Sequence, residues 1–234
     1  MPPYVYSDHL KVLNQFLGKS DGKDKLCATI QYACMFLSAG EAGNVKKIQA
    51  SVAAARKVFR VMKPLESLTP LLLNPGFLGN RPGLIEAIGK LKSVLMAGYF
   101  SFDHLIWSGH AGLVTDTELL ARIQKISSSC WFGGSLCVII CECFEILNLA
   151  AVERAEENDE DWAKEQNRVK NEIRRRSLTL THACLQATLA IGILQLLPLK
   201  PRAVGLIGAI TSALNCYMLF PSLPKRVEKT TKKD

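Results

Sequence analysis

Two long segments without a charged residue lie close together in the last quarter of the 234-residue chain. Ser177–Leu199 holds 23 residues, Ala203–Pro224 holds 22, and only Lys200-Pro201-Arg202 separates them. A helix rises about 1.5 Å per residue, so about 20 apolar residues cross the hydrocarbon core of a bilayer, which is about 30 Å thick. Pro198 and Pro201 lie where the chain has to turn, because proline interrupts helices. The pattern predicts a membrane helical hairpin over residues 177–224.

Basic residues flank these segments, and the net charge of the chain is +8. Arg174-Arg175-Arg176 precedes the first segment, and a basic tail over 225–234 follows the second. Each Lys or Arg near an anionic membrane surface adds about 1 kcal/mol of attraction, and such residues tend to stay on the cytoplasmic side. Membrane phospholipid is therefore the expected partner. Nucleic acid is not expected, because the basic clusters accompany the spans and no reader motif is visible.

The sequence gives no sign of catalysis. Its four histidines are scattered, and the common hydrolase, metalloprotease and phosphate-loop motifs do not occur. Most of the eight cysteines lie in apolar segments without a C-x-x-C pair, so we expect them to be reduced and buried. Cys137, Cys141 and Cys143 cluster with Glu142, but in an apolar segment that lacks a polar second shell. We therefore predict no enzyme, no catalytic residue, no cofactor and no metal site.

An amphipathic helix is predicted over Val45–Met62. The apolar residues that repeat along one side, beginning with Val45, are Ile48, Val52, Ala55, Phe59 and Met62. The basic residues in and just after this helix are Lys46, Lys47, Arg56, Lys57, Arg60 and Lys63. Such a helix can lie in the headgroup region, with its apolar side in lipid and its basic residues on phosphates. It can equally pack its apolar stripe on a neighbouring helix, and the pattern alone leaves both interpretations open.

The remaining patterns predict an all-α protein, with N-terminal amphipathic helices followed by a membrane-embedded bundle or hairpin. Region 1–83 holds the expected helices Val5–Leu17 and Lys23–Leu37, the amphipathic helix, and a Pro/Gly-rich loop or hinge over 64–83. Region 84–152 holds membrane-associated helices, Leu84–Leu113 and an apolar run from Ile126 to Val152. Region 153–176 is a charged connecting loop or helix. The hairpin follows over 177–224, and then the tail.

Two details of the membrane segments bear on function. Glu142 and Glu145 interrupt an apolar run, and an acid at mid-membrane costs about 2.5–3.5 kcal/mol, so both are expected to face protein or a boundary. Gly205, Ala209 and Ala213 are spaced by four residues. Small residues on one side of a helix allow close helix association in lipid, which suggests a homo-oligomer.

Several segments together resemble one family, the peroxisomal membrane protein 11 (peroxin-11) proliferation factors, in its plant-type form. Asp24–Leu37 is similar to the family's D-K-x-C-x-x-I-Q-Y-x-x-x-F-L opening, and Ala55–Lys63 to its A-R-K-x-F-R-x-x-K helix. Asp103 and Trp107 fit its D-x-x-x-W segment, and Leu194–Lys225 resembles the plant-type ending. The order and spacing of these motifs cover nearly the whole chain.

The resemblance implies a multi-pass protein of the peroxisomal membrane, with both termini in the cytosol, that elongates and tubulates the membrane before fission. It also implies self-association and cooperation with a fission adaptor and a dynamin-related GTPase. In such proteins the basic amphipathic helix inserts into one leaflet. Family topology places one span near Ser93–Trp107 and another near Ala203–Leu219, which differs from the hairpin over 177–224.

Two other functions remain open at this point. The chain could form a membrane channel for small metabolites, lined by Leu84–Leu113 and the helix of Glu142 and Glu145. It could also act as an adaptor that only recruits fission machinery.

Overall fold

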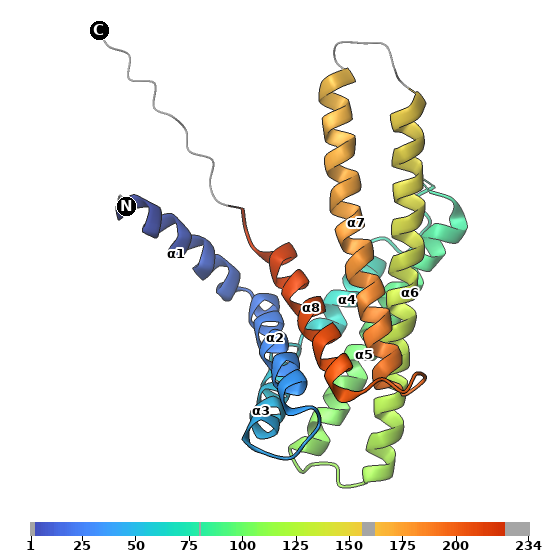
Figure 1. The fold of residues 1–234 in the computed structure, drawn as a ribbon. Helices are drawn as coiled ribbons and strands as arrows, with labels where there is room; N and C mark the ends of the chain where they lie inside the picture. The colour runs from blue at the N-terminus through green and yellow to red at the C-terminus, as the bar shows by residue number, and fades with distance from the viewer. Residues whose placement is uncertain (1–2, 80, 156–161, 223–234) are drawn as a thin grey trace.

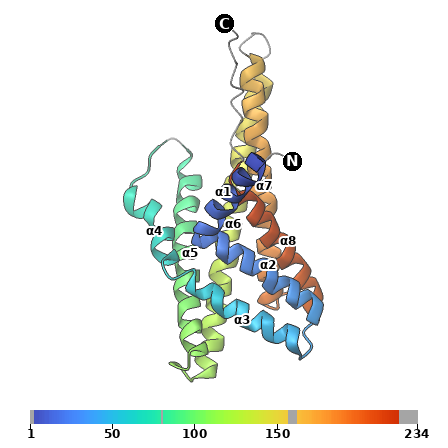
Figure 2. The same cartoon turned by 90° about the vertical axis from the view of Figure 1, so that its left-hand side faces the viewer.

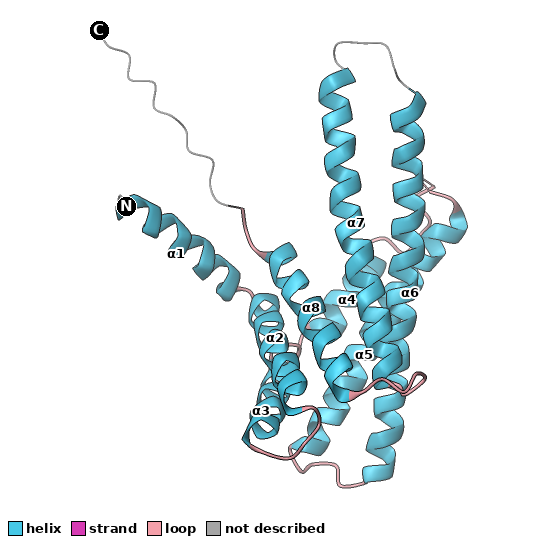
Figure 3. Ribbon diagram, viewed as in Figure 1, coloured by secondary structure: helices cyan, strands magenta, loops and turns pink. Residues whose placement is uncertain are grey.

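A computed structural model describes residues 3–79, 81–155 and 162–222, and within these ranges the chain forms eight helices and no strand (Figures 1 and 3). The all-α prediction is confirmed. The helices are α1 (Pro3–Gly18), α2 (Ser20–Ser38), α3 (Asn44–Val58), α4 (Lys63–Leu73), α5 (Gly83–His110), α6 (Thr117–Ala155), α7 (Trp162–Ile193) and α8 (Pro201–Leu219). The basic tail over 225–234 lies outside the described residues, as does the acidic part of the connecting region at 156–161.

The helices form two groups that meet along α7 and α8. Helix α2 packs along α8, while α5, α6 and α7 pack side by side. Helix α3 contacts both α2 and α5, and α4 lies against α5 on the outside of the second group (Figure 2). The paired helices α6 and α7 extend beyond the rest of the bundle (Figure 1).

The segment between α3 and α5 differs from the prediction. The prolines of 64–83 suggested a loop, yet 63–73 is helical, so the prediction is wrong for the first half of the segment. Pro64 lies in the first turn of α4, where a helix has no acceptor for the missing N–H and the fixed φ of proline fits. Pro70 lies inside α4, and only 74–82 is irregular.

The interior of the bundle is unusually polar. Its buried apolar residues include several alanines, such as Ala28, Ala97 and Ala190, beside larger side chains such as Leu189. Many other large apolar side chains lie outside, where Leu73, for example, is 73 % exposed. Buried beside the alanines are charged and hydroxyl side chains, namely Asp24, Arg56, Arg60, Asp103, Ser93, Ser127, Ser128, Ser135, Thr211 and Ser212. An apolar exterior around a polar interior is the arrangement that lipid, rather than water, favours as a solvent.

Two described helices are long and apolar enough to cross a membrane: Thr117–Ala151 within α6, and α8. The second arm of the predicted hairpin is thus a candidate span, but the first arm is not. Helix α7 ends at Ile193, where Gln195 adopts a positive φ of 58°, so its charge-free part is only 177–193, or about 25 Å at about 1.5 Å per residue. Residues 194–197, which the prediction included in the first arm, form the turn before Pro198.

Candidate functional site

Asp24 of α2 is the centre of a charge network beneath α3. Its carboxylate is buried and meets two arginines, Arg56 in α3 and Arg60 in the turn that follows. The Nε atoms of Arg56 and Arg60 lie 3.0 Å and 2.9 Å from Asp24 Oδ1. Arg60 Nη2 and Lys25 Nζ lie 3.3 Å and 3.2 Å from Oδ2. One carboxylate therefore neutralises part of the charge of three cations.

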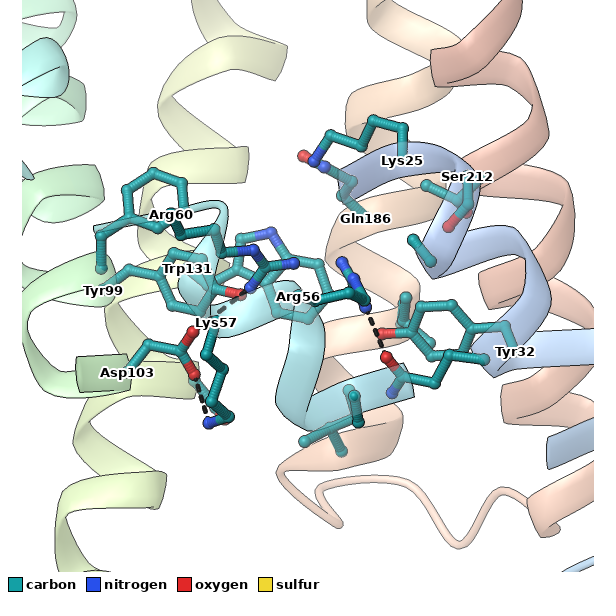
Figure 4. A pocket seen from close by; sticks show the side chains of 18 of the residues that line it. Lys25, Tyr32, Arg56, Lys57, Arg60, Tyr99, Asp103, Trp131, Gln186 and Ser212 are labelled. Atoms are coloured by element: carbon teal, nitrogen blue, oxygen red, sulfur yellow. Dashed lines mark hydrogen bonds and ion pairs between the residues drawn. The ribbon is translucent and has the colours of Figure 1, made fainter. Parts of the chain in front are cut away.

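Asp103 of α5 is the second carboxylate of the network. Lys57 Nζ lies 2.8 Å from Asp103 Oδ1, and Arg60 Nη1 lies 3.3 Å from Oδ2. The same Nη1 donates to the hydroxyl oxygen of Tyr99 at 3.0 Å. Figure 4 shows these groups converging from α5 and from the end of α3. Arg60 thus links α2 to α5, and it holds the turn that follows α3 between these two helices.

The spacing of residues along the helices explains this arrangement. Tyr99 and Asp103 are four residues apart on α5, so both lie on one side of that helix. Arg56 in the last turn of α3 and Arg60 in the turn that follows are also four residues apart, and both reach Asp24. Burial alone would raise the pKa of Asp24, but the charges of Arg60, Lys25 and Arg56 outweigh it and hold that pKa well below 3.8. Burial also disfavours the charged form of Arg60, yet Tyr99, Asp24 and Asp103 raise its pKa. Both groups are ionised at neutral pH.

Because the charged side of α3 faces inward, apolar side chains face outward. Met62, just after the helix, is 60 % exposed, and α4 also carries exposed apolar side chains. We call this surface the α3–α4 apolar surface; it consists of Ile48, Val58, Val61, Met62, Leu65 and Leu72. Of the residues predicted to insert into the membrane, Ile48, Ala55 and Met62 are exposed, whereas Val52 and Phe59 are half-buried. Val58 and Val61 are exposed although the periodicity did not single them out.

The structure divides the predicted headgroup ligands into two sets. Lys46 and Lys47 are exposed, and Lys46 Nζ donates to the Gly40 carbonyl oxygen at 2.8 Å. Lys63 pairs with Asp21 at 2.6 Å and with Glu66 at 2.5 Å. The other three, Arg56, Lys57 and Arg60, belong to the network described above, where their charges face carboxylates of the same chain.

Two small residues of α8, Gly205 and Gly208, lie in close contact with α2 of the same chain. A Cβ at Gly205 would lie 2.4 Å from the backbone nitrogen of Phe36 in α2, so α2 covers this position. Gly208, which the four-residue spacing did not include, lies against the ring of Tyr32, where a Cβ would be 2.3 Å from Cδ1. Ala209 is half-buried and Ala213 is exposed. Of the three predicted association residues, only Ala213 is exposed.

The two acids of α6 are paired with arginines. Arg176 of α7 lies 3.1 Å from Glu142 and 3.5 Å from Glu145. Arg81 lies 2.9 Å from Glu145 on its other carboxylate oxygen. Both acids therefore face protein, and they tie α6 to α7 and to the segment before α5.

A cavity of about 300 Å³ lies beside the network, among α2, α3, α5, α6, α7 and α8. Its lining is largely polar, and Figure 4 shows Lys25, Gln186 and Ser212 on one side, with Tyr99 and Trp131 on the other. Among the described residues, no group of three or more His, Cys, Asp and Glu side chains is placed to hold a metal ion.

Sequence reasoning missed the central residues of this site. Asp24 and Asp103 entered the sequence analysis only as motif residues without a role, and nothing in their local pattern, or in that of Tyr99, connects them with Arg60. The available signal was the basic stretch itself. A cluster of arginines and lysines on one side of a helix has to be solvated by water, by headgroups or by internal carboxylates, and only the first two were considered.

Comparison with known proteins matches most of the helical region. A model of the family described as peroxisomal biogenesis factor 11 matches residues 10–220. The chain is 34 % identical over 223 residues to peroxisomal membrane protein 11D from Arabidopsis thaliana, covering 92 % of this chain and 94 % of the relative. It is 36 % identical to peroxisomal membrane protein 11C of the same plant over 217 residues, covering 90 % and 92 %. With peroxisomal membrane protein 11-1 from Oryza sativa subsp. japonica it shares 33 % identity over 214 residues, covering 88 % and 90 %. No solved structure matches the chain.

Proposed function

The chain belongs to the peroxisomal biogenesis factor 11 family, and on this premise we propose that it elongates the peroxisomal membrane ahead of fission by inserting an apolar surface into one leaflet. Family membership supports the general role in peroxisome proliferation and biogenesis. The observation that supports the finer mechanism is the α3–α4 apolar surface. It faces outward because ion pairs with Asp24 hold Arg56 and Arg60 inside the bundle.

Burial of this surface in lipid supplies the driving force. A large apolar side chain contributes about 1.5–3 kcal/mol when it is fully buried. These side chains are already partly covered by the bundle, so each adds roughly half of that amount on insertion. Inserted volume expands the leaflet that receives it relative to the other leaflet, and a bilayer relieves such an asymmetry by curving toward the expanded side. Exposed Lys46 and Lys47 are the headgroup contacts of this proposal.

The charge network has a distinct part in the mechanism. A free amphipathic helix presents its basic side to the headgroups and chooses its own depth. Here Arg56 and Arg60 are held by Asp24, so α3 keeps a fixed orientation relative to α2 and α5. The insertion depth is then set by the whole bundle, and a rigid wedge bends a bilayer more effectively than a helix that can tilt.

The directions of the helices support an even number of crossings. In Figure 1, α6 and α8 run in the same direction and α7 runs back between them. If α6 and α8 each cross the membrane, the chain must return through α7, although α7 alone is less apolar. Helix α5 runs antiparallel to α6 beside it, and its crossing makes four. We therefore propose a multi-pass protein with both termini in the cytosol, and protease protection of tagged termini in intact peroxisomes tests it.

The proposal includes self-association and recruitment. Exposed Ala213, with half-buried Ala209 beside it, forms the proposed contact of α8 with a second copy. Lateral association concentrates the wedges, and a fission adaptor and a dynamin-related GTPase then complete the division. No catalytic step is assigned to the chain. A metabolite pore lined by Glu142 and Glu145 receives less support, because both acids are paired with Arg176.

Reconstitution of the full chain into liposomes that contain anionic phospholipid tests the wedge. Electron microscopy should show tubules with the wild-type protein and few with the double substitution Val58→Asp and Met62→Asp. Val58→Leu with Met62→Leu keeps the surface apolar and should retain tubulation. Asn14→Asp with Gln15→Glu adds the same charge on exposed α1 and should also retain it. Undiminished tubulation by the acidic α3 variant would contradict the mechanism, and release of a trapped solute without tubules would favour the pore.

A further inference from the structure

The central cavity carries more positive than negative charge. Four cations belong to the network that borders it, namely Lys25, Arg56, Lys57 and Arg60. Against them stand two carboxylates among the described residues that contact this network, Asp24 and Asp103. The difference is two positive charges, held in a region where the surrounding protein solvates them poorly.

The two carboxylates have little capacity left for these charges. Both oxygens of Asp24 already contact cations, Oδ1 two guanidinium nitrogens and Oδ2 one guanidinium and one ammonium nitrogen. Both oxygens of Asp103 are engaged as well, by Lys57 and Arg60. Additional neutralisation has to come from a group that is not part of the described chain.

Two of the cations are partly available to such a group. Arg56 Nε donates to Asp24 at 3.0 Å, and Arg56 Nη1 donates to Gln31 at 2.7 Å. Its third nitrogen, Nη2, has no acceptor among the described residues. The Lys25 side chain keeps 24 % of its surface accessible, and Asp24 is its one ion-pair partner among the described residues. Burial lowers the pKa of Lys25. The charge of Asp24 raises it, and the charges of Arg60 and Arg56 lower it further. A bound anion would favour the charged form of Lys25 and so raise this pKa again.

The neutral part of the lining suits an acceptor-rich ligand. Gln186 and Ser212 face the same part of the cavity as Lys25 in Figure 4, and an amide N–H and a hydroxyl both donate to anionic oxygens. A phosphate monoester carries about 1.5 to 2 negative charges near neutral pH, which matches the excess of two, whereas a carboxylate carries one. Guanidinium and ammonium groups are the usual charged ligands of phosphate. The cavity of about 300 Å³ has space for such a group with several waters.

From this match of charge, donors and volume, we propose that the cavity among α2, α3, α7 and α8 binds a phosphate-bearing anion, with Lys25 and Arg56 as its charged ligands and Gln186 and Ser212 as neutral donors. The phosphate is either a free anion or the headgroup of a phospholipid that enters from the bilayer. The site is independent of the α3–α4 apolar surface, so failure of the wedge mechanism would leave it intact.

Binding is measured on the full chain in nanodiscs. In discs of phosphatidylcholine alone, inorganic phosphate is titrated against chloride at equal ionic strength, with calorimetry and the thermal midpoint as readouts. In a second set, a fraction of the lipid is phosphatidic acid, whose headgroup is a phosphate monoester. Saturable stabilisation in the first set assigns the site to a free anion, and stabilisation only in the second assigns it to a headgroup; either result supports the proposal.

Two variants locate the site, each with a matched control. Lys25→Gln should weaken binding at least tenfold, whereas Lys23→Gln removes the same charge from the exposed side of the same helix and should stay within twofold. Gln186→Glu places an internal anion in the cavity, and it should abolish phosphate binding and raise the thermal midpoint of the unliganded protein. Gln15→Glu on exposed α1 should do neither. The proposal is overturned if neither phosphate source stabilises the wild type, or if Lys25→Gln and Gln186→Glu bind as the controls do.

Discussion

Replacing Asp24 with Asn tests whether the charge network holds α3 in place. The amide occupies the same volume as the carboxylate, so the substitution removes charge without opening a cavity. It leaves Arg56, Arg60 and Lys25 without their shared counter-ion, in a position where the Asp24 side chain is only 4 % exposed. Removing one partner of a buried ion pair costs about 3–5 kcal/mol, because the remaining charge stays buried and uncompensated. We expect the free energy of unfolding to fall by that amount.

The assay is equilibrium unfolding in mixed detergent micelles, followed by far-UV circular dichroism and by tryptophan fluorescence. Trp131 lies at the cavity and stacks on Tyr99 at 5.7 Å between ring centroids, so its emission reports the packing of α5 on α6. Asp8→Asn is the matched control. Asp8 pairs with Lys11 at 3.4 Å on the surface of α1, where an ion pair contributes about 0–1 kcal/mol.

A loss of stability in Asp24→Asn no larger than that in Asp8→Asn would refute this reasoning. It would mean that water in the cavity already solvates the cations. A second check follows from the cavity charge, since the excess rises from two to three in the variant. Phosphate should therefore restore more stability to Asp24→Asn than it adds to the wild type.

Three further predictions follow from the same contacts. The pKa of Asp24 in the folded protein lies below its ordinary value of 3.8. Its contribution to stability is therefore complete above about pH 5 and is lost as the pH falls toward the folded-state pKa. Unfolding measured from pH 7 to pH 3 should show this loss of stability in the wild type and not in Asp24→Asn. Gly205→Ala should destabilise the protein by about 1–3 kcal/mol, because the new methyl group meets the backbone of α2. Gly89 has open space around it, so Gly89→Ala should be neutral or stabilising. Equal effects of the two substitutions would exclude close α2–α8 packing. Ala213→Leu should reduce cross-linked dimers in membranes without changing monomer stability, and unchanged cross-linking would remove this position from the interface.

Much of the local structure could be predicted from sequence periodicity. The helices α1, α2, α3 and α5 lie close to the expected ranges, and α8 is a candidate span as the charge-free segment suggested. These features depend on residues within a few turns of one another. The errors at Pro64 and at the end of α7 have the same local origin. Proline was read as a helix breaker where it starts a helix, and the turn expected at Pro198 already begins after Ile193.

The orientation of α3 could not be obtained in this way. Its basic residues were assigned to headgroups, but Arg60 finds its carboxylates 36 and 43 residues away, on α2 and α5. A helical wheel contains no information about such partners. In a water-soluble protein the apolar stripe would have been the inward side by default. A surrounding of lipid removes that default, and the ion pairs, which are stronger in a poorly polar interior, then decide which side of the helix faces inward.

Photo-cross-linking of the unmodified protein in liposomes, with a phospholipid that carries a diazirine near the middle of its acyl chain, tests the central claim most directly. Mass spectrometry of the peptides identifies each side chain that lies in the hydrocarbon. We expect label on Val58, Val61 and Met62 in addition to the four proposed spans, α5 to α8. Label confined to these spans, with the peptide from α3 and α4 unmodified, would contradict the account, because the apolar surface would then face water or another protein.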